Sequence, residues 1–283
     1  MGAIFGPAGN SDSYRQKKDK IGLFDYLKSF NLKAYEYQCG RGVRISNEKA
    51  EEFGQSMIGI KLSLHAPYYI SLSSVEKEKR DNSINYILQS AAAAKAMGAD
   101  RVVVHSGSCS KISREKALEL AKDTMKRAIE ALKKEDLYDI SICPETMGKI
   151  NQLGTLDEVL TLCEIDDNMI PCIDFGHLNA RTYGGLKNQK DFEDVLYAIE
   201  NRLGFDRLKS FHSHFSKIEY TFPGGEKRHL TFEDENYGPD FELLAELIAK
   251  KNLSPTFICE SSGTQAEDAQ KMQSIYNKFL NNK

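Results

Sequence analysis

The sequence predicts an α/β protein built as a single (β/α)8 TIM barrel, with a metal site at the C-terminal face of its strands. Short apolar runs alternate with helical segments along the 283 residues, as in parallel α/β folds. The runs are continuously apolar, which is typical of parallel strands covered on both faces. Eight runs favour a closed barrel, and six of them end in a histidine or a carboxylate, where barrels carry their reactive groups.

Each expected strand is one of these apolar runs, in chain order Ala3–Gly6, Ala34–Tyr37, Lys61–Leu64, Arg101–Val104, Ile140–Cys143, Ile170–Ile173, Leu208–Phe211 and Thr256–Cys259. Helices are expected where apolar residues recur every three or four positions, at Gly22–Phe30, Asn47–Gln55, Glu76–Met97, Ser113–Lys134, Thr155–Cys163, Phe192–Leu203, Phe241–Asn252 and Thr264–Leu280. Residues 215–240 should form a long loop, and such loops tend to be functional. No linker marks a boundary, so one domain over residues 1–283 is expected.

The composition bounds the class of protein. A hydrophobic share of 41% supports a large core, and no apolar run approaches the roughly 20 residues of a membrane span. The N-terminus lacks the regions of a signal peptide, and the six cysteines form no Cys-x-x-Cys pair, so a reduced cytoplasmic protein is expected. The net charge of −3 is not that of a nucleic-acid binder relying on Lys and Arg alone, but bound metal cations can also meet phosphates.

The stretch from Ile140 to Gly148 shows the recurring design most clearly, because a buried strand ends at Glu145 and a glycine-containing loop follows. One histidine at a strand end is more often structural than a ligand. Here all six histidines of the chain and three carboxylates fall at or near the same end of the predicted barrel, namely His65, His105, His177, His212, His214, His229, Glu145, Asp174 and Glu260. This gathering predicts a metal site, and imidazole with carboxylate suits zinc, manganese or iron.

The number of candidate ligands exceeds what one ion needs. Two-metal centres with a bridging carboxylate stabilise both the attacking and the leaving oxygen of an in-line phosphoryl displacement. Phosphodiester hydrolysis is therefore the first chemistry to consider.

Five motifs extend this interpretation to a family. They are His65-Ala66-Pro67-Tyr68, Val104-His105-Ser106-Gly107, Glu145-Thr146-x-Gly148, Cys172-Ile173-Asp174-x-x-His177 and Cys259-Glu260. In order and spacing, together with Phe5-Gly6-Pro7-Ala8-Gly9, they resemble the endonuclease IV family of apurinic/apyrimidinic endonucleases. The resemblance implies a TIM barrel with two or three zinc ions, with manganese as an alternative metal. It also implies a monomer that cuts double-stranded DNA 5′ to abasic sites and leaves a 3′-hydroxyl.

Carried over position by position, the resemblance assigns each candidate ligand. It implies one zinc at His65, His105 and Glu145. Glu145 would bridge to a second zinc held by Asp174, His212 and Glu260, and would orient the nucleophile as the catalytic carboxylate. His177 and His229 would hold a third ion.

Two positions depart from the family pattern. The family has an Asp-x-His element in the seventh loop, whereas this chain has Glu226-Lys227-Arg228-His229, with Lys227 at the expected carboxylate position. A protonated lysine cannot bind a metal, so either Glu226 takes its place by a one-residue shift or Lys227 contacts phosphate instead. His214 replaces an amide-type residue and is either a substitute ligand or a donor behind the ligands.

Contacts to DNA are expected from two loops. Tyr68 and Tyr69 follow His65, and Arg41 follows the second strand. In the family these loops enter the minor groove, and aromatic wedges with arginine suit that task. Packing at the barrel rim is an equally simple role for Tyr68.

Two other functions use much of the same site. A one-metal sugar isomerase or epimerase of the xylose-isomerase-like type would need Glu145, Asp174, His212 and Glu260, but not the histidines at 65, 105, 177 and 229. A non-catalytic metal-dependent DNA-binding protein that has lost the third site is another alternative. Incision activity would exclude it.

Overall fold

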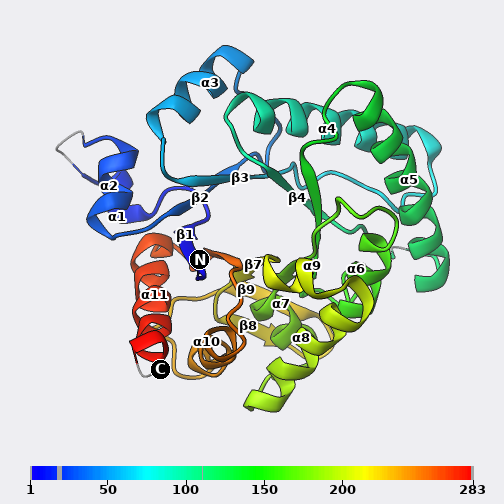
Figure 1. Cartoon of the computed structure of the whole chain (residues 1–283). Coiled ribbons are helices and arrows are strands. Elements are labelled where there is room, and N and C mark those ends of the chain that lie inside the picture. Colours follow the sequence, from blue (N-terminus) through cyan, green and yellow to red (C-terminus); the bar gives the residue numbers. More distant parts are fainter. Residues whose placement is uncertain (1, 18–20, 110, 282–283) are drawn as a thin grey trace.

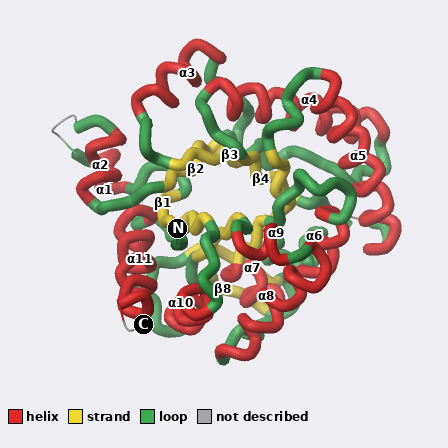
Figure 2. The backbone as a smooth tube through the Cα atoms, viewed as in Figure 1, coloured by secondary structure: helices red, strands yellow, loops and turns green. Residues whose placement is uncertain are grey.

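The structure is a computed structural model that describes residues 2–17, 21–109 and 111–281. Eight parallel strands form its central sheet in the order β1-β10-β7-β6-β5-β4-β3-β2. Their bounds are β1 Ile4–Pro7, β2 Ala34–Gln38, β3 Lys61–His65, β4 Arg101–His105, β5 Ser141–Glu145, β6 Cys172–Asp174, β7 His212–Phe215 and β10 Thr256–Cys259. Figure 2 shows the strands as an inner ring with the helices outside it, which confirms the predicted TIM barrel.

The ring closes where β1 meets β2. Ala8 forms a parallel bridge with Glu36, and the N–H of Gly9 donates to the Glu36 carbonyl at 2.9 Å. A Cβ at Gly6 would lie 1.9 Å from the carbonyl oxygen of Ala34. The sequence therefore needs glycine at position 6, because any side chain there would hold the two strands apart.

The outer layer consists of helices that surround the barrel (Figure 1). Their bounds are α1 Asp12–Arg15, α2 Leu23–Ser29, α3 Asn47–Ser56, α4 Lys77–Ala96, α5 Arg114–Lys134, α6 Leu156–Cys163, α7 Phe175–Arg181, α8 Gln189–Leu203, α9 Phe205–Lys209, α10 Phe241–Lys250 and α11 Gln265–Asn281. The helix α6 shows how the local sequence fixes the start of a helix, because Thr155 and Glu158 form a reciprocal capping box there. None of the described helices is long and apolar enough to cross a membrane.

Each expected helix and each expected strand except the seventh overlaps an observed one, whereas α1, α7 and α9 are helices that the sequence did not predict. The first two residues of the strand predicted at Leu208–Phe211 instead belong to α9, and β7 begins only at His212. Leu208 and Phe211 are both buried and three residues apart, which a helical turn satisfies as well as a strand does. The predicted loop 215–240 contains an antiparallel hairpin, β8 Ile218–Thr221 and β9 Gly225–His229. All six cysteines are free and buried.

Candidate metal centre

Three groups of potential ligands lie side by side at the C-terminal ends of the strands, and Glu145 belongs to two of them. The first group consists of His65, His105 and Glu145, the last residues of β3, β4 and β5. The Nε2 atoms of His65 and His105 lie 3.5 and 3.4 Å from Oε2 of Glu145. The Nδ1 of His65 lies 2.8 Å from the Ala66 carbonyl, which leaves Nε2 to face the site.

The second group lies on the other side of the Glu145 carboxylate and contains Glu145, Asp174, His214 and Glu260. His214 Nδ1 lies 2.9 Å from Glu145 Oε1 and 3.5 Å from Glu260 Oε1. Asp174 ends β6 and caps α7, where its Oδ1 accepts from the N–H of His177 at 2.7 Å. This cap explains the Asp-x-x-His spacing, because it orients both side chains at one helix start.

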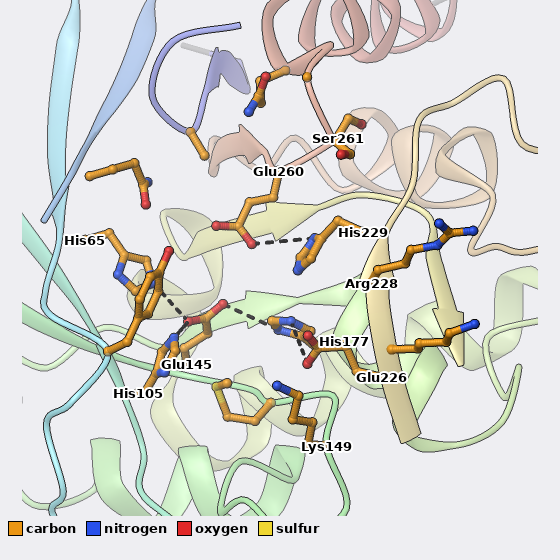
Figure 3. Close-up of a pocket in the computed structure, with 18 of the residues that line it drawn as sticks. His65, His105, Glu145, Lys149, His177, Glu226, Arg228, His229, Glu260 and Ser261 are labelled. Atoms are coloured by element: carbon orange, nitrogen blue, oxygen red, sulfur yellow. Dashed lines mark ion pairs between the residues drawn. The ribbon is translucent and has the colours of Figure 1, made fainter. Parts of the chain in front are cut away.

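The third group consists of His177, Glu226 and His229. Figure 3 shows His177 and Glu226 on the side of Glu145 opposite His65 and His105. His177 Nε2 lies 3.4 Å from Glu226 Oε2, and its Nδ1 lies 3.0 Å from the Thr146 carbonyl. His229 Nδ1 lies 2.8 Å from Ser216 Oγ. Both imidazoles are thus held through Nδ1, which leaves Nε2 for the site.

Charges within the site are strongly coupled. Burial alone would raise the pKa of Glu145, but His214, His177 and His65 hold it well below its usual range. Burial raises the pKa of Asp174 to about 6. Burial opposes the charge of His177, yet Asp174, Glu145 and Glu226 raise its pKa to about 10. The site thus places imidazolium against carboxylate, an arrangement that a metal cation would replace with loss of protons.

The residues fit divalent metal ions. Two buried carboxylate oxygens, Glu145 Oε2 and Asp174 Oδ2, accept no hydrogen bond from any described residue. Such orphaned oxygens are costly in a protein interior unless a cation binds them. The three groups contain only imidazole nitrogens and carboxylate oxygens, a donor set that suits zinc, manganese or iron.

The structure corrects the assignment of His212 and His214. In the register of the barrel, His214 is level with Asp174, whereas His212 is level with Cys172, two residues deeper. His214 therefore joins the second group, and His212 faces Glu36 below it, with Nε2 2.9 Å from Glu36 Oε2. The assignment carried over from the family resemblance does not hold for His212, because the depth of an inward side chain depends on where its strand begins, and β7 begins at His212.

The structure also settles which residue of the hairpin faces His177. A bulge in β9 leaves Lys227 unpaired between the pairs Glu219↔Arg228 and Tyr220↔Glu226. The extra residue brings Glu226 and His229 to the same side of the hairpin. Lys227 and Arg228 instead each contact the carboxylate of Glu219 at 2.6 Å. Glu226, one residue before the expected carboxylate position 227, is thus the residue that faces His177.

The predicted DNA-contacting residues lie on neighbouring loops beside the site. Tyr68 is 58% exposed and Tyr69 47%, and Arg41 is also exposed. The N–H of Tyr68 donates to the Gly40 carbonyl at 3.1 Å, so the loops after β2 and β3 touch. The Tyr68 ring also packs 5.3 Å from the ring of His65. Its side chain therefore both contacts the site and presents a surface to solvent.

A cavity of about 770 Å³ opens over the site. Glu145 and the first and third groups line it, and four exposed cationic residues stand among its walls, namely Arg15, Lys149, Lys227 and Arg228. Cations around a carboxylate-rich floor suit a polyanionic ligand whose charge they offset.

Sequence reasoning missed one residue at the base of the site, Glu36 on β2. Its carboxylate is fully buried and contacts both His212 and His214 at 2.9 Å. Burial alone would raise the pKa of Glu36, but the two imidazoles hold it well below its usual range. The available signal was a carboxylate inside the otherwise uncharged strand Ala34–Gln38, where a buried charge needs a partner.

Comparison with known proteins defines the class. Residues 24–278 match the family model described as the xylose isomerase-like TIM barrel, so the chain belongs to that family. It is 35% identical over 279 residues to an uncharacterized protein of Methanocaldococcus jannaschii, covering 98% of this chain and 97% of the relative. It is 30% identical over 223 residues to a protein of Enterococcus faecalis named probable endonuclease 4, covering 74% and 72%. Within the family the chain is thus related to endonuclease IV.

Solved structures show the same fold. A D-tagatose 3-epimerase-like protein matches with a TM-score of 0.70 at 18% identity, covering 94% of this chain and 96% of the other. Endonuclease IV from Thermus thermophilus matches with a TM-score of 0.65 at 17% identity, covering 93% and 94%. Proteins with different names therefore share this barrel, and the fold alone does not identify a function.

Proposed function

We propose that this protein is a metal-dependent endonuclease that hydrolyses the DNA phosphodiester bond 5′ to abasic sites and leaves a 3′-hydroxyl. The observation that carries the proposal is the set of three adjoining ligand groups, of which two share Glu145. A sugar epimerase of the one-metal kind would need only Glu145, Asp174, His214 and Glu260. The relationship to proteins named probable endonuclease 4 supports the same choice.

Each group would hold one divalent ion, with zinc as the expected metal and manganese as an alternative. Bound at such a centre, metal ions lower the pKa of water toward about 7 and offset charge on the phosphate. Glu145 would orient the reactants through its two oxygens, each of which faces a different group. The third group lies on the side of Glu145 opposite His65 and His105 (Figure 3). There His177, Glu226 and His229 would face a leaving oxygen.

The cavity walls would position the DNA. Arg15, Lys149, Lys227 and Arg228 would contact phosphates, which gives affinity without sequence preference. Tyr68, Tyr69 and Arg41 would fill the gap at the abasic nucleotide. A monomer acting in the cytoplasm belongs to the same proposal, and sedimentation of the purified protein tests its first part.

Incision of an end-labelled duplex with one tetrahydrofuran abasic analogue tests the proposal. Specific cutting on the 5′ side, leaving a 3′-hydroxyl, is expected with the zinc-loaded protein, and an intact duplex of the same sequence is the control. Glu145→Gln should reduce turnover at least roughly a thousandfold, about 4 kcal/mol in activation free energy, with duplex binding largely retained. Near-normal turnover in this variant would contradict the assignment.

The epimerase alternative is favoured by one observation, the fold match to a D-tagatose 3-epimerase-like protein. Ketose substrates assayed with the same preparation distinguish the two functions. Epimerisation that persists in His229→Gln, without any incision by the parent protein, would replace the nuclease proposal with the epimerase one.

A further inference from the structure

Beneath the second ligand group lies a buried polar cluster that shares His214 with that group. Its centre is Glu36, which is 0% exposed, as are His212 and His214 above it. Oε1 of Glu36 lies 2.9 Å from His214 Nε2 and accepts from Gln38 Nε2 at 3.2 Å. Oε2 lies 2.9 Å from His212 Nε2 and accepts from Ser63 Oγ at 2.9 Å. All partners of this carboxylate therefore come from three strands of the barrel.

The position of Glu36 determines how His214 can act. Nε2 of the His214 imidazole lies at an ion-pair distance of 2.9 Å from the carboxylate but forms no hydrogen bond with any described residue, and Nδ1 is the nitrogen that faces Glu145 and Glu260. A carboxylate behind a histidine fixes the ring orientation and makes the opposite nitrogen a stronger ligand. A buried negative charge is tolerated here because two imidazoles and a hydroxyl contact it.

We propose that Glu36 is a positioning residue, which holds Nδ1 of His214 toward the second ligand group and thereby sets the affinity of that group for a divalent metal. The inference rests on the metal centre of the proposed function, and not on the identity of the substrate. His212 occupies the second oxygen of Glu36 and keeps the carboxylate from rotating away. It is thus a structural partner in this cluster.

Titration of the metal-free protein with Co²⁺, followed by visible absorption, tests the proposal without an activity assay. Glu36→Gln keeps the side-chain shape but removes the charge, and should weaken one class of Co²⁺ sites roughly ten- to a hundredfold with a change in its absorption band. The matched control is Ser63→Ala, which removes a partner of Oε2 and leaves the contact of Oε1 with His214. Its Co²⁺ affinity should stay within about twofold of the parent protein.

Circular dichroism and thermal unfolding of the metal-free proteins show whether each variant folds. If Glu36→Gln does not fold, Glu36→Asp tests the same contact, because the shorter side chain keeps the charge but withdraws it from His214. Equal affinities in the parent and the folded Glu36 variants would overturn this inference and leave the metal centre intact. A parent protein that binds no Co²⁺ would overturn both.

A different outcome would also overturn it. Cys172, His212 and His214 form a further buried group with ligand atoms within 4.8 Å of one another. If Cys172→Ala lowered the number of bound Co²⁺ ions by one, the imidazoles beside Glu36 would themselves hold an ion. An unchanged number of ions in this variant is the expected result.

Discussion

The deep and the rim parts of the candidate centre are built in different ways. The deep part is the second group, Glu145, Asp174, His214 and Glu260, whose residues end, lie within or directly follow four barrel strands. The rim part is His177, Glu226 and His229, of which two stand on the β8–β9 hairpin outside the barrel sheet. Side-chain exposure is at most 16% in the deep part, whereas His229 is 25% exposed.

The two parts are also held by different contacts. Strand register fixes the deep part, since Glu145 pairs with Cys172 and Asp174 with His214. The rim part depends on the loop after β5, where the N–H of Glu226 donates to the Gly148 carbonyl at 3.1 Å. Arg181 in turn holds this loop by donating to the carbonyls of Met147 and Lys149. Strand pairing thus holds the deep part in place, while contacts between loops hold the rim part.

Replacing the deep carboxylate should have the largest effect. Asp174→Asn can still cap α7 through its side-chain oxygen, so folding should be retained. Loss of the charge should remove the ion of the deep group and reduce incision at least roughly a thousandfold. Metal content by atomic emission and the incision rate measure the two effects. Full metal content with full activity would show that the deep part is not the centre of the site.

Replacing the rim histidine should have a smaller and more local effect. His229→Gln should lose one equivalent of metal and reduce incision roughly ten- to a hundredfold, because the ions of the first two groups stay in place. The absorption of Co²⁺ bound at the deep group should not change. A deep-group spectrum that changed as much as in Asp174→Asn would mean that the two parts are not separable.

A change in the loop that supports the rim should act without touching a ligand. In Gly148→Ala the new Cβ would lie 2.6 Å from Glu226 Cβ and 2.9 Å from His177 Cδ2, so the hairpin must move away. We expect roughly tenfold weaker metal binding at the rim, with unchanged binding at the deep group. Gly22→Ala is the matched control, because among the described residues its Cβ would meet no atom closer than 3.9 Å. A metal affinity at the rim part equal to that of the parent protein would show that the loop after β5 does not position the rim residues.

The smallest expected effect concerns the stability of the same loop. Glu158 accepts from Arg114 at 2.7 Å and from the N–H groups of Gly154 and Thr155. Burial alone would raise the pKa of Glu158, but Arg114 and the two N–H groups lower it. The stabilisation is therefore present above the unfolded pKa of roughly 4.3 and is lost as the pH falls through the lower folded value.

Glu158→Gln should accordingly lower the free energy of unfolding by about 1 to 2 kcal/mol at pH 7. The difference from the parent protein should shrink below about pH 4, as the parent carboxylate is protonated. Denaturant unfolding of the metal-free proteins at pH 7 and at acidic pH measures both values. A constant difference at all pH values would assign the effect to packing rather than to the charge.

The sequence alone determined the barrel and most of the strand ends that carry the site. Apolar runs followed directly by His65, His105 and Asp174, and by Glu145 after one proline, were sufficient, because a buried parallel strand and its polar end are both local features. The structure brings these residues together as expected. The capping spacing from Asp174 to His177 is local as well.

Only the tertiary structure decided three other points. It is His214 and not His212 that faces Glu145, and this depends on the depth at which β7 enters the barrel. Neighbouring strands set that depth through their register. It is Glu226 and not Lys227 that faces His177, and this depends on a bulge in β9, which is a property of two paired strands. The contact of Glu36 with His212 and His214 depends on side chains of β2 and β7 meeting inside the barrel. Such pairings join residues far apart in the chain, so no local pattern of side chains records them.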